Sequence, residues 1–198
     1  MNTLLNKIKL CEICKDHLPS QPRPVVQLSP YSKIIMISQA PSKRVHETGI
    51  PGNDASGKKL REWLNVDEAT FYDPNYFSLV PVGFCYPGKG ISGDLPPRPE
   101  CAPIWHPKIL NSFKSVPLII LVGQFAQRYY LKKECKGSLT ETVKSYKEYL
   151  PKYFPLPHPS PRNQNWVKIN SWFTEEVIPE LRKRIKSVIC KVKKSDAC

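Results

Sequence analysis

Lys33-Ile-Ile-Met-Ile-Ser38 and Pro117-Leu-Ile-Ile-Leu-Val-Gly123 are the two stretches that decide the fold. Both are short, continuous and apolar, and each ends in small or polar residues, which is typical of strands buried on both faces of a parallel sheet. We therefore expect them to be adjacent central strands. A helical pattern follows each of them, over residues 57–64 and 124–131.

Further strands are predicted at residues 76–82 and 152–156, and further helices at residues 138–149 and 172–188. Strand, loop and helix thus alternate along the chain, with no internal repeat and no low-complexity linker. This order predicts an α/β protein, built as a three-layer α/β/α sandwich around a small parallel sheet of about four strands.

Length and composition indicate a single domain. The 198 residues suffice for a sizeable core, which we place at residues 1–189, before a basic and disordered tail at residues 190–198. No apolar run is long enough for a signal peptide or a membrane span, so we expect a cytoplasmic monomer that does not bind a membrane. The net charge of +13 favours a polyanionic partner, although a solvated basic helix would explain the C-terminal charges equally well.

Three loops are candidates for a ligand site, because ligands of open parallel sheets bind at the carboxyl ends of the strands. They are residues 38–57, 83–101 and 158–165. The first is rich in Gly, Pro and small polar residues, which lets its backbone approach a ligand closely. The last contains three prolines, which hold the backbone around His158 in place.

Four cysteines form a pattern of their own. Cys11 and Cys14 are a close pair, and Cys85 and Cys101 frame a loop rich in proline and glycine that needs something to hold it. The spacing suits an iron-sulfur cluster and a zinc ion alike, and ordinary free thiols are a third alternative. The remaining cysteines show no partner pattern; they are Cys135, Cys190 and Cys198.

Three motifs, taken with these cysteines, resemble the uracil-DNA glycosylase superfamily, specifically its iron-sulfur branches, families four and five. The motifs are Ser38-Gln39-Ala40-Pro41-Ser42, Asn53-Asp54-Ala55-Ser56-Gly57 and His158-Pro159-Ser160-Pro161-Arg162-Asn163. The resemblance implies a DNA glycosylase that removes uracil or a related deaminated base from DNA, with water as the nucleophile. It also implies a 4Fe-4S cluster on Cys11, Cys14, Cys85 and Cys101.

The expected roles follow from a reaction in which the sugar becomes oxocarbenium-like and the base leaves as an anion. His158 suits the donor at the base oxygen, and Asp54 matches the family-five residue that handles the attacking water. Arg162 and Lys43 are expected to meet DNA phosphates. The expected substrate-binding residues are Gln39, Ala40, Pro41, Asn53, Phe84, Ser160, Arg162 and Asn163.

Simpler interpretations stand beside these. Asp54 is also suited to cap a helix, His158 to a hydrogen-bonded loop position, and Trp166 to the core rather than to a wedge in DNA. The chain departs from the families at Gly52, which lacks the stacking aromatic that follows it in them. It departs also at Pro81, where family four has an Asn, and at Gln39, where family four has a carboxylate. Phe84 or Tyr86 is the expected substitute for that aromatic. The alternative function is a non-catalytic iron-sulfur protein that binds nucleic acid on the same fold.

Overall fold

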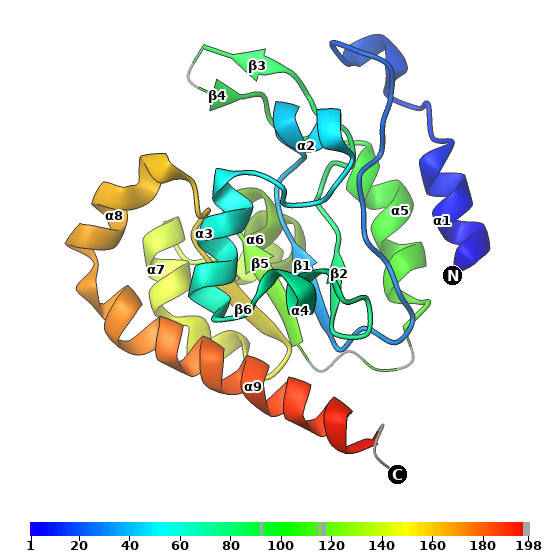
Figure 1. The fold of residues 1–198 in the computed structure, drawn as a ribbon. Helices are drawn as coiled ribbons and strands as arrows, with labels where there is room; N and C mark the ends of the chain where they lie inside the picture. Colours follow the sequence, from blue (N-terminus) through cyan, green and yellow to red (C-terminus); the bar gives the residue numbers. More distant parts are fainter. Residues whose placement is uncertain (92, 114, 116–117, 196–198) are drawn as a thin grey trace.

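A four-stranded parallel sheet forms the centre of the computed structural model, which describes residues 1–91, 93–113, 115 and 118–195 (Figure 1). The strand order is β2 (Phe77–Leu79), β1 (Ile34–Ile37), β5 (Leu118–Val122) and β6 (Tyr153–Leu156). β1 and β5 are neighbours, with Ile34 opposite Leu118, as the two apolar runs predicted. The expected α/β/α sandwich is confirmed.

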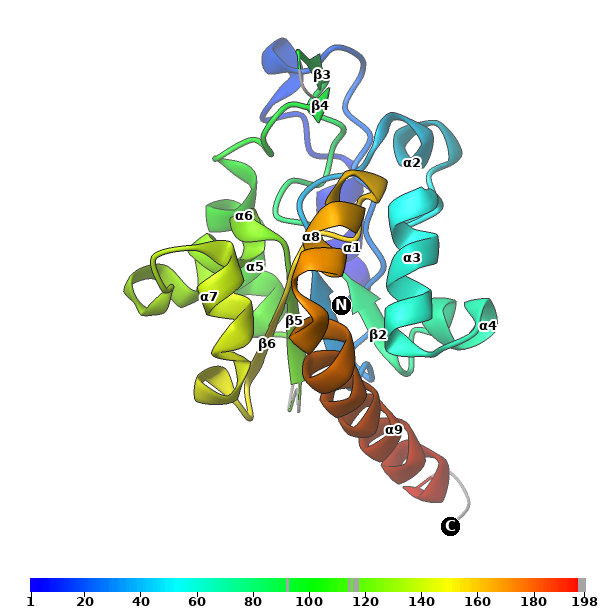
Figure 2. The ribbon, with the colours of Figure 1, turned by 90° about the vertical axis from the view of Figure 1, so that its left-hand side faces the viewer.

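Both faces of the sheet are covered, which explains why the central strands are apolar at every position. Ile34 and Met36 of β1 face one layer, and Ile35 and Ile37 face the other. The first layer contains α3 (Ala55–Leu64), α4 (Glu68–Tyr72) and α9 (Ile178–Ser195). The second contains α1 (Asn2–Lys9), α5 (Cys101–Leu110) and α6 (Gln124–Leu131), and Figure 2 shows α3 and α4 on the opposite side from α5 and α6.

Several elements differ in extent from the sequence prediction. The helix expected at 138–149 is divided into α7 (Leu139–Lys144) and a 3-10 turn, η3 (Tyr146–Tyr149). The helix expected at 172–188 starts with a π-helical turn, η5 (Phe173–Val177), and continues as α9. Residues 190–195 of the expected tail are helical, and residues 196–198 lie outside the described part of the chain.

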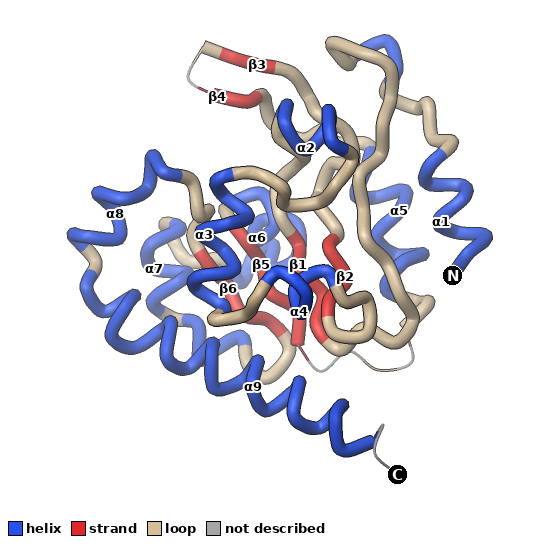
Figure 3. Tube along the Cα trace, in the orientation of Figure 1, coloured by secondary structure: helices blue, strands red, loops and turns tan. Residues whose placement is uncertain are grey.

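The loops gather at the carboxyl ends of the strands, where Figure 3 shows long tan segments between short helices. After β1 the chain adds β2 on one side, and it later adds β5 on the other, so the order reverses between β1 and β5. Such a switch point leaves a crevice in which ligands bind. No helix of the described segments is long and apolar enough to cross a membrane.

The remaining elements are short. They are η1 (Lys15–His17), α2 (Lys43–Thr48), the antiparallel pair β3 (Lys89–Gly90) and β4 (Gly93–Asp94), η2 (Lys132–Glu134), η4 (Pro161–Asn163) and α8 (Gln164–Ile169). The hairpin of β3 and β4 lies inside the segment that the sequence predicted to be an irregular loop.

Candidate functional site

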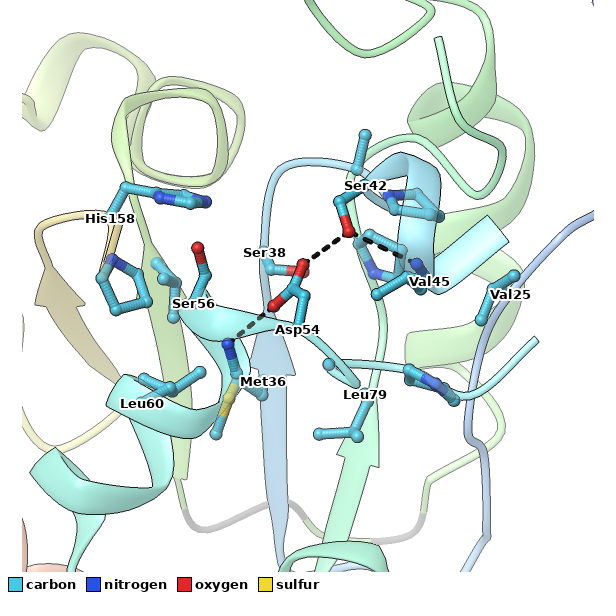
Figure 4. Close-up of a pocket in the computed structure, with 18 of the residues that line it drawn as sticks. Val25, Met36, Ser38, Ser42, Val45, Asp54, Ser56, Leu60, Leu79 and His158 are labelled. Carbon is cyan, nitrogen blue, oxygen red and sulfur yellow. Dashed lines mark hydrogen bonds between the residues drawn. The ribbon is translucent and has the colours of Figure 1, made fainter. Parts of the chain in front are cut away.

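A pocket lies at the carboxyl ends of the strands, next to the switch point (Figure 4). The loop after β1 and the first turn of α3 form one wall, and the chain after β6 forms the opposite wall. The ends of β1, β2 and β5 contribute to the floor. Its lining includes Met36, Ser38, Ala40, Pro41, Ser42, Val45, Gly52, Asp54, Ser56, Gly57, Leu60, Phe71, Leu79, Pro81, Val122, His158 and Pro159.

Asp54 is held in the wall of this pocket by two donors. It is the N-cap of α3, where its Oδ1 accepts a hydrogen bond from the Gly57 backbone N at 2.8 Å. Its Oδ2 accepts a hydrogen bond from the Ser42 hydroxyl at 2.6 Å. Ser42 in turn caps α2, accepting from the Val45 backbone N at 3.3 Å. The predicted cap role is confirmed, and each carboxylate oxygen keeps acceptor capacity for a further donor such as water.

Glycine is required at position 57, because a side chain there would overlap the Gly52 carbonyl. The backbone at Gly52, with φ of +66°, passes directly over the first turn of α3 and brings Asp54 to the pocket. A Cβ at Gly52 would lie 3.4 Å from the ring of Phe71, a residue of α4 that also lines the pocket. An aromatic ring therefore does adjoin the site, although it comes from a helix that the sequence did not predict.

His158 follows β6 and faces Asp54 from the opposite wall (Figure 4). The Asn163 side chain fixes its backbone by donating to the His158 carbonyl at 2.7 Å. Within the described part of the chain, the structure shows no hydrogen bond to the His158 ring, so the interpretation as a hydrogen-bonded loop histidine holds for its carbonyl and not for its ring. Desolvation lowers the pKa of His158, while the nearby carboxylates of Asp54 and Asp94 oppose that shift. The ring is therefore neutral at neutral pH and keeps one N–H that can be donated to a ligand.

The structure places some of the other predicted substrate-binding residues in the pocket lining and others outside it. Ala40 and Pro41 line the pocket, whereas Gln39 and Asn53 are not part of its lining. The Gln39 carbonyl accepts from the Gly83 backbone N at 3.0 Å and so ties the loop after β1 to the chain after β2.

After Pro159, the residues of the His-Pro-Ser segment do not line the pocket, and they stabilise the loop that carries His158. Ser160 caps η4 by accepting from the Arg162 backbone N at 3.3 Å, and Asn163 holds the His158 carbonyl as described. The guanidinium of Arg162 lies against Gly93 of β4. These residues therefore shape the loop and its neighbours.

Two aromatic predictions have clear outcomes. Phe84 is 2% exposed and stacks on His106 on the other side of the sheet, so it is not the stacking platform of this pocket. Trp166 donates from Nε1 to the Thr140 hydroxyl at 2.8 Å and packs edge-on against Trp172. Trp166 is partly buried and packs against the core, as the simpler interpretation predicted.

The four cysteines of the sequence pattern line one small pocket, although they come from two distant parts of the chain. Its walls are apolar and include prolines and Phe84, and the Phe84 backbone N donates to the Cys101 sulfur at 3.4 Å. Burial raises the pKa of Cys85 to about 11 and that of Cys101 to about 12. Within the described ranges, no group of three or more His, Cys, Asp or Glu residues is placed to hold a metal ion.

A model of the uracil DNA glycosylase superfamily matches residues 26–182 of the chain. The chain belongs to the uracil-DNA glycosylase superfamily. Enzymes of this superfamily are in general hydrolases of the DNA glycosylase type, and DNA is their substrate. The matched region contains both walls of the pocket, with Asp54 and His158, and it begins after Cys11 and Cys14.

A second groove adjoins the pocket, with Pro159 as a wall of both. It lies between α3 and α8 and carries three lysines, Lys58, Lys59 and Lys168, beside polar groups of the His-Pro-Ser segment. Glu62 also lines the groove and pairs with Lys59 at 2.9 Å. The fold places this basic groove directly beside the pocket.

Proposed function

We propose that this protein is a DNA glycosylase that hydrolyses the N-glycosidic bond of uracil or a related deaminated base in DNA. The observation that carries the proposal is the pairing of Asp54 and His158 on opposite walls of one pocket, in a member of the uracil-DNA glycosylase superfamily. The reaction needs an acidic group at the sugar and a donor at the departing base, and a pocket with these two groups on facing walls supplies both.

Asp54 acts at deoxyribose C1′ in this proposal. Its carboxylate orients the attacking water and stabilises the positive charge that develops on the sugar. The bonds from Gly57 N at 2.8 Å and Ser42 Oγ at 2.6 Å hold the carboxylate in one orientation, which reduces the cost of reorganisation during the reaction. The water's oxygen bonds to C1′ as the bond to the base nitrogen breaks, and Asp54 accepts the proton released by the water.

His158 acts at the base. A neutral imidazole donates its N–H to a base oxygen, where negative charge collects as the base leaves. The desolvation that lowers the pKa of His158 keeps the ring neutral and makes this hydrogen bond stronger than it would be in water. The ring needs no large movement, because Asn163 and the prolines fix the loop that carries it.

The flipped base lies against the apolar part of the pocket. Phe71 supplies aromatic surface, and Pro81 occupies the position of the family-four Asn, so no amide from that position reads the base edge. Ser38 and Ser56 also line the pocket and offer hydroxyls to the base. We therefore expect selection by shape and by hydroxyl contacts, which tolerates more than one deaminated base.

The DNA backbone is held by the basic groove between α3 and α8, beside the pocket mouth. Lys58 and Lys168 of this groove neutralise phosphates that flank the flipped nucleotide, whereas Lys59 is paired with Glu62 at 2.9 Å. On the other side of the pocket, Lys43 of α2 is 74% exposed and only loosely paired with Glu47, at 3.8 Å. The net charge of +13 supports the same assignment.

We further propose that Cys11, Cys14, Cys85 and Cys101 hold a 4Fe-4S cluster. All four cysteines line one small pocket, which brings together residues from two distant parts of the chain. The Phe84 N–H at the Cys101 sulfur is the kind of hydrogen bond that tunes such clusters. The cluster would join the N-terminal segment to α5 and to the chain after β2.

The cluster proposal is tested with anaerobically purified protein, by measuring its iron and zinc content and its absorbance at about 400 nm. We expect the wild type to contain iron and to show this absorbance, and we expect Cys101→Ser to lose both. Cys135→Ser is the matched control, because Cys135 lies outside the four-cysteine pocket and should leave the spectrum unchanged. Zinc in a colourless protein would overturn the cluster proposal without bearing on base excision.

The glycosylase proposal is tested with single- and double-stranded oligonucleotides that contain uracil, hypoxanthine or xanthine, scored for abasic sites. Base release by the wild type, strongly reduced in His158→Ala and Asp54→Asn, is expected. Tight DNA binding without release from any substrate would refute the enzyme and leave the non-catalytic alternative.

A further inference from the structure

The β3–β4 hairpin stands out from the body of the protein at the edge of the sheet that carries the pocket (Figure 1). Lys89 is paired with Asp94 and Gly90 with Gly93 in antiparallel register. The base of the hairpin is closed by a hydrogen bond from the Leu95 backbone N to the Gly88 carbonyl at 2.8 Å. The two strands therefore form a hydrogen-bonded hairpin that projects from the protein.

Ile91, directly after β3, is fully exposed among the described residues. Its exposed fraction is 109%, the highest of the large apolar side chains recorded as exposed in the described chain. A single exposed apolar residue is ordinary on a protein surface. This one is distinguished by its position on a two-stranded projection whose base is tied to the candidate active site.

Two contacts tie the hairpin to the loop that carries His158. The Arg162 guanidinium, four residues after His158, lies so close to Gly93 that a side chain at that glycine would collide with it. The carboxylate of Asp94 in β4 also lies near enough to the His158 ring to oppose the lowering of its pKa. The hairpin is thus fixed beside the pocket mouth.

The loop after His158 has no comparable apolar tip. Trp166 is the large apolar side chain of residues 159–166, and its contacts with Thr140, Trp172 and Phe173 hold it against the core. A glycosylase that extrudes a base from a duplex must fill or split the stack that the base leaves, and proteins do so with apolar side chains such as Ile, Leu or Phe.

The charges around the hairpin suit a duplex. Lys89 of β3 and Lys43 and Arg44 of α2 are exposed. Figure 1 shows α2 next to the β3–β4 hairpin. Asp94 and Glu47 are the acidic groups among them; Asp94 faces Tyr86 and His158, and Glu47 lies 3.8 Å from the Lys43 ammonium. The cations can therefore meet phosphates while the tip enters the stack.

We propose that the β3–β4 hairpin is the wedge of this protein, with Ile91 inserting between base pairs of double-stranded DNA to hold the target nucleotide out of the helix. The proposal rests on the glycosylase function of the pocket. It assigns the opening of the base stack to Ile91 of the hairpin and the chemistry to the loop that carries His158.

The first test compares base release from single- and double-stranded substrates by the wild type and Ile91→Ala. We expect Ile91→Ala to be about 10-fold slower or more on the duplex and within about twofold of the wild type on the single strand, where no stacked pair must be opened. Ile169→Ala is the matched control: Ile169 is 82% exposed at the end of α8, and its loss should leave both rates unchanged. A duplex rate for Ile91→Ala within about twofold of the wild type would overturn the wedge.

The second test needs no catalysis and so separates the wedge from the glycosylase proposal. A duplex with 2-aminopurine beside a tetrahydrofuran abasic analogue becomes more fluorescent when the stack is split. Wild type and Ile169→Ala should raise the fluorescence at saturation, and Ile91→Ala should raise it much less. An equal rise with Ile91→Ala, or no rise with the wild type, would refute the insertion even if base release is observed.

Discussion

Replacement of Asp54 separates its two roles, the helix cap and the catalytic carboxylate. Asp54→Asn keeps an amide oxygen for the Gly57 N–H and loses the charge, while Asp54→Ala loses both. An N-cap lost to alanine costs about 1 kcal/mol. The Ser42 hydroxyl, which donates to Asp54 at 2.6 Å, loses a charged acceptor worth about 1.5 to 3 kcal/mol. We expect Asp54→Ala to be destabilised by about 3 kcal/mol and Asp54→Asn by about 1 kcal/mol.

The effect on activity should not follow that order. Removing the group that handles the attacking water costs about 100-fold or more, and Asp54→Asn removes it as fully as Asp54→Ala does. We therefore expect both variants to lose base release in single-turnover assays by a similar factor, at a temperature where both are folded. Urea unfolding of each variant measures the stability term separately.

Asp67 provides the control. It caps α4, accepting from the Thr70 backbone N at 2.7 Å, and is not part of the pocket lining. Asp67→Ala should lose stability of the size expected for a cap and keep activity. If Asp54→Asn retained activity within about threefold of the wild type, the carboxylate would not be handling water, and the role of Asp54 would be the cap alone.

Three further results are expected. His158→Ala should lose about 100- to 1000-fold in base release. Because the folded pKa of His158 lies below its ordinary value, the ring of the wild type should stay neutral until the pH falls below 6.5, and an NMR titration midpoint above that pH would contradict the neutral-donor assignment. Gly57→Ala should unfold at lower urea and lose activity, since its Cβ would overlap the Gly52 carbonyl; normal stability would show that the loop can shift. His106, whose pKa burial lowers from 6.5 to about 4, binds a proton first in the unfolded chain, so its share of stability is complete above pH 6.5 and is lost as the pH falls towards 4. The loss of stability from this group reaches about 2 kcal/mol when the pH has fallen to about 5. His106→Gln should therefore flatten the pH dependence of the free energy of unfolding in urea, and an unchanged pH dependence would refute this role of His106.

The sequence predicted the sheet well because its central strands are buried on both faces. In a chain of this size, a short continuous apolar run is seldom anything other than a buried strand. The helix predicted at residues 124–131 is confirmed as α6 with the same bounds. The short elements α2, α4 and α8 were not predicted. Elements of five or six residues are stabilised by tertiary packing and caps more than by their own periodicity.

The candidate site was predicted in part. Asp54 and His158 were found because each belongs to a motif at the end of a strand, and strand ends of a parallel sheet converge. Phe71 was missed because it lies in α4, with no motif around it, and reaches the pocket through its packing under Gly52. Phe84 was misplaced because adjacency to Cys85 in sequence does not decide which face of the sheet a side chain meets.

The sequence by itself determined the sheet, the order of the loops and the residue types that can carry the chemistry, because strand burial and motif spacing are local properties. The tertiary structure decided which of those residues meet. It bonded Asp54 to Ser42 and Gly57 and left the His158 ring without a hydrogen-bond partner among the described residues. It also packed Trp166 against the core and exposed Ile91 on the β3–β4 hairpin. These outcomes depend on contacts between segments far apart in the chain, whose free energies no local pattern contains.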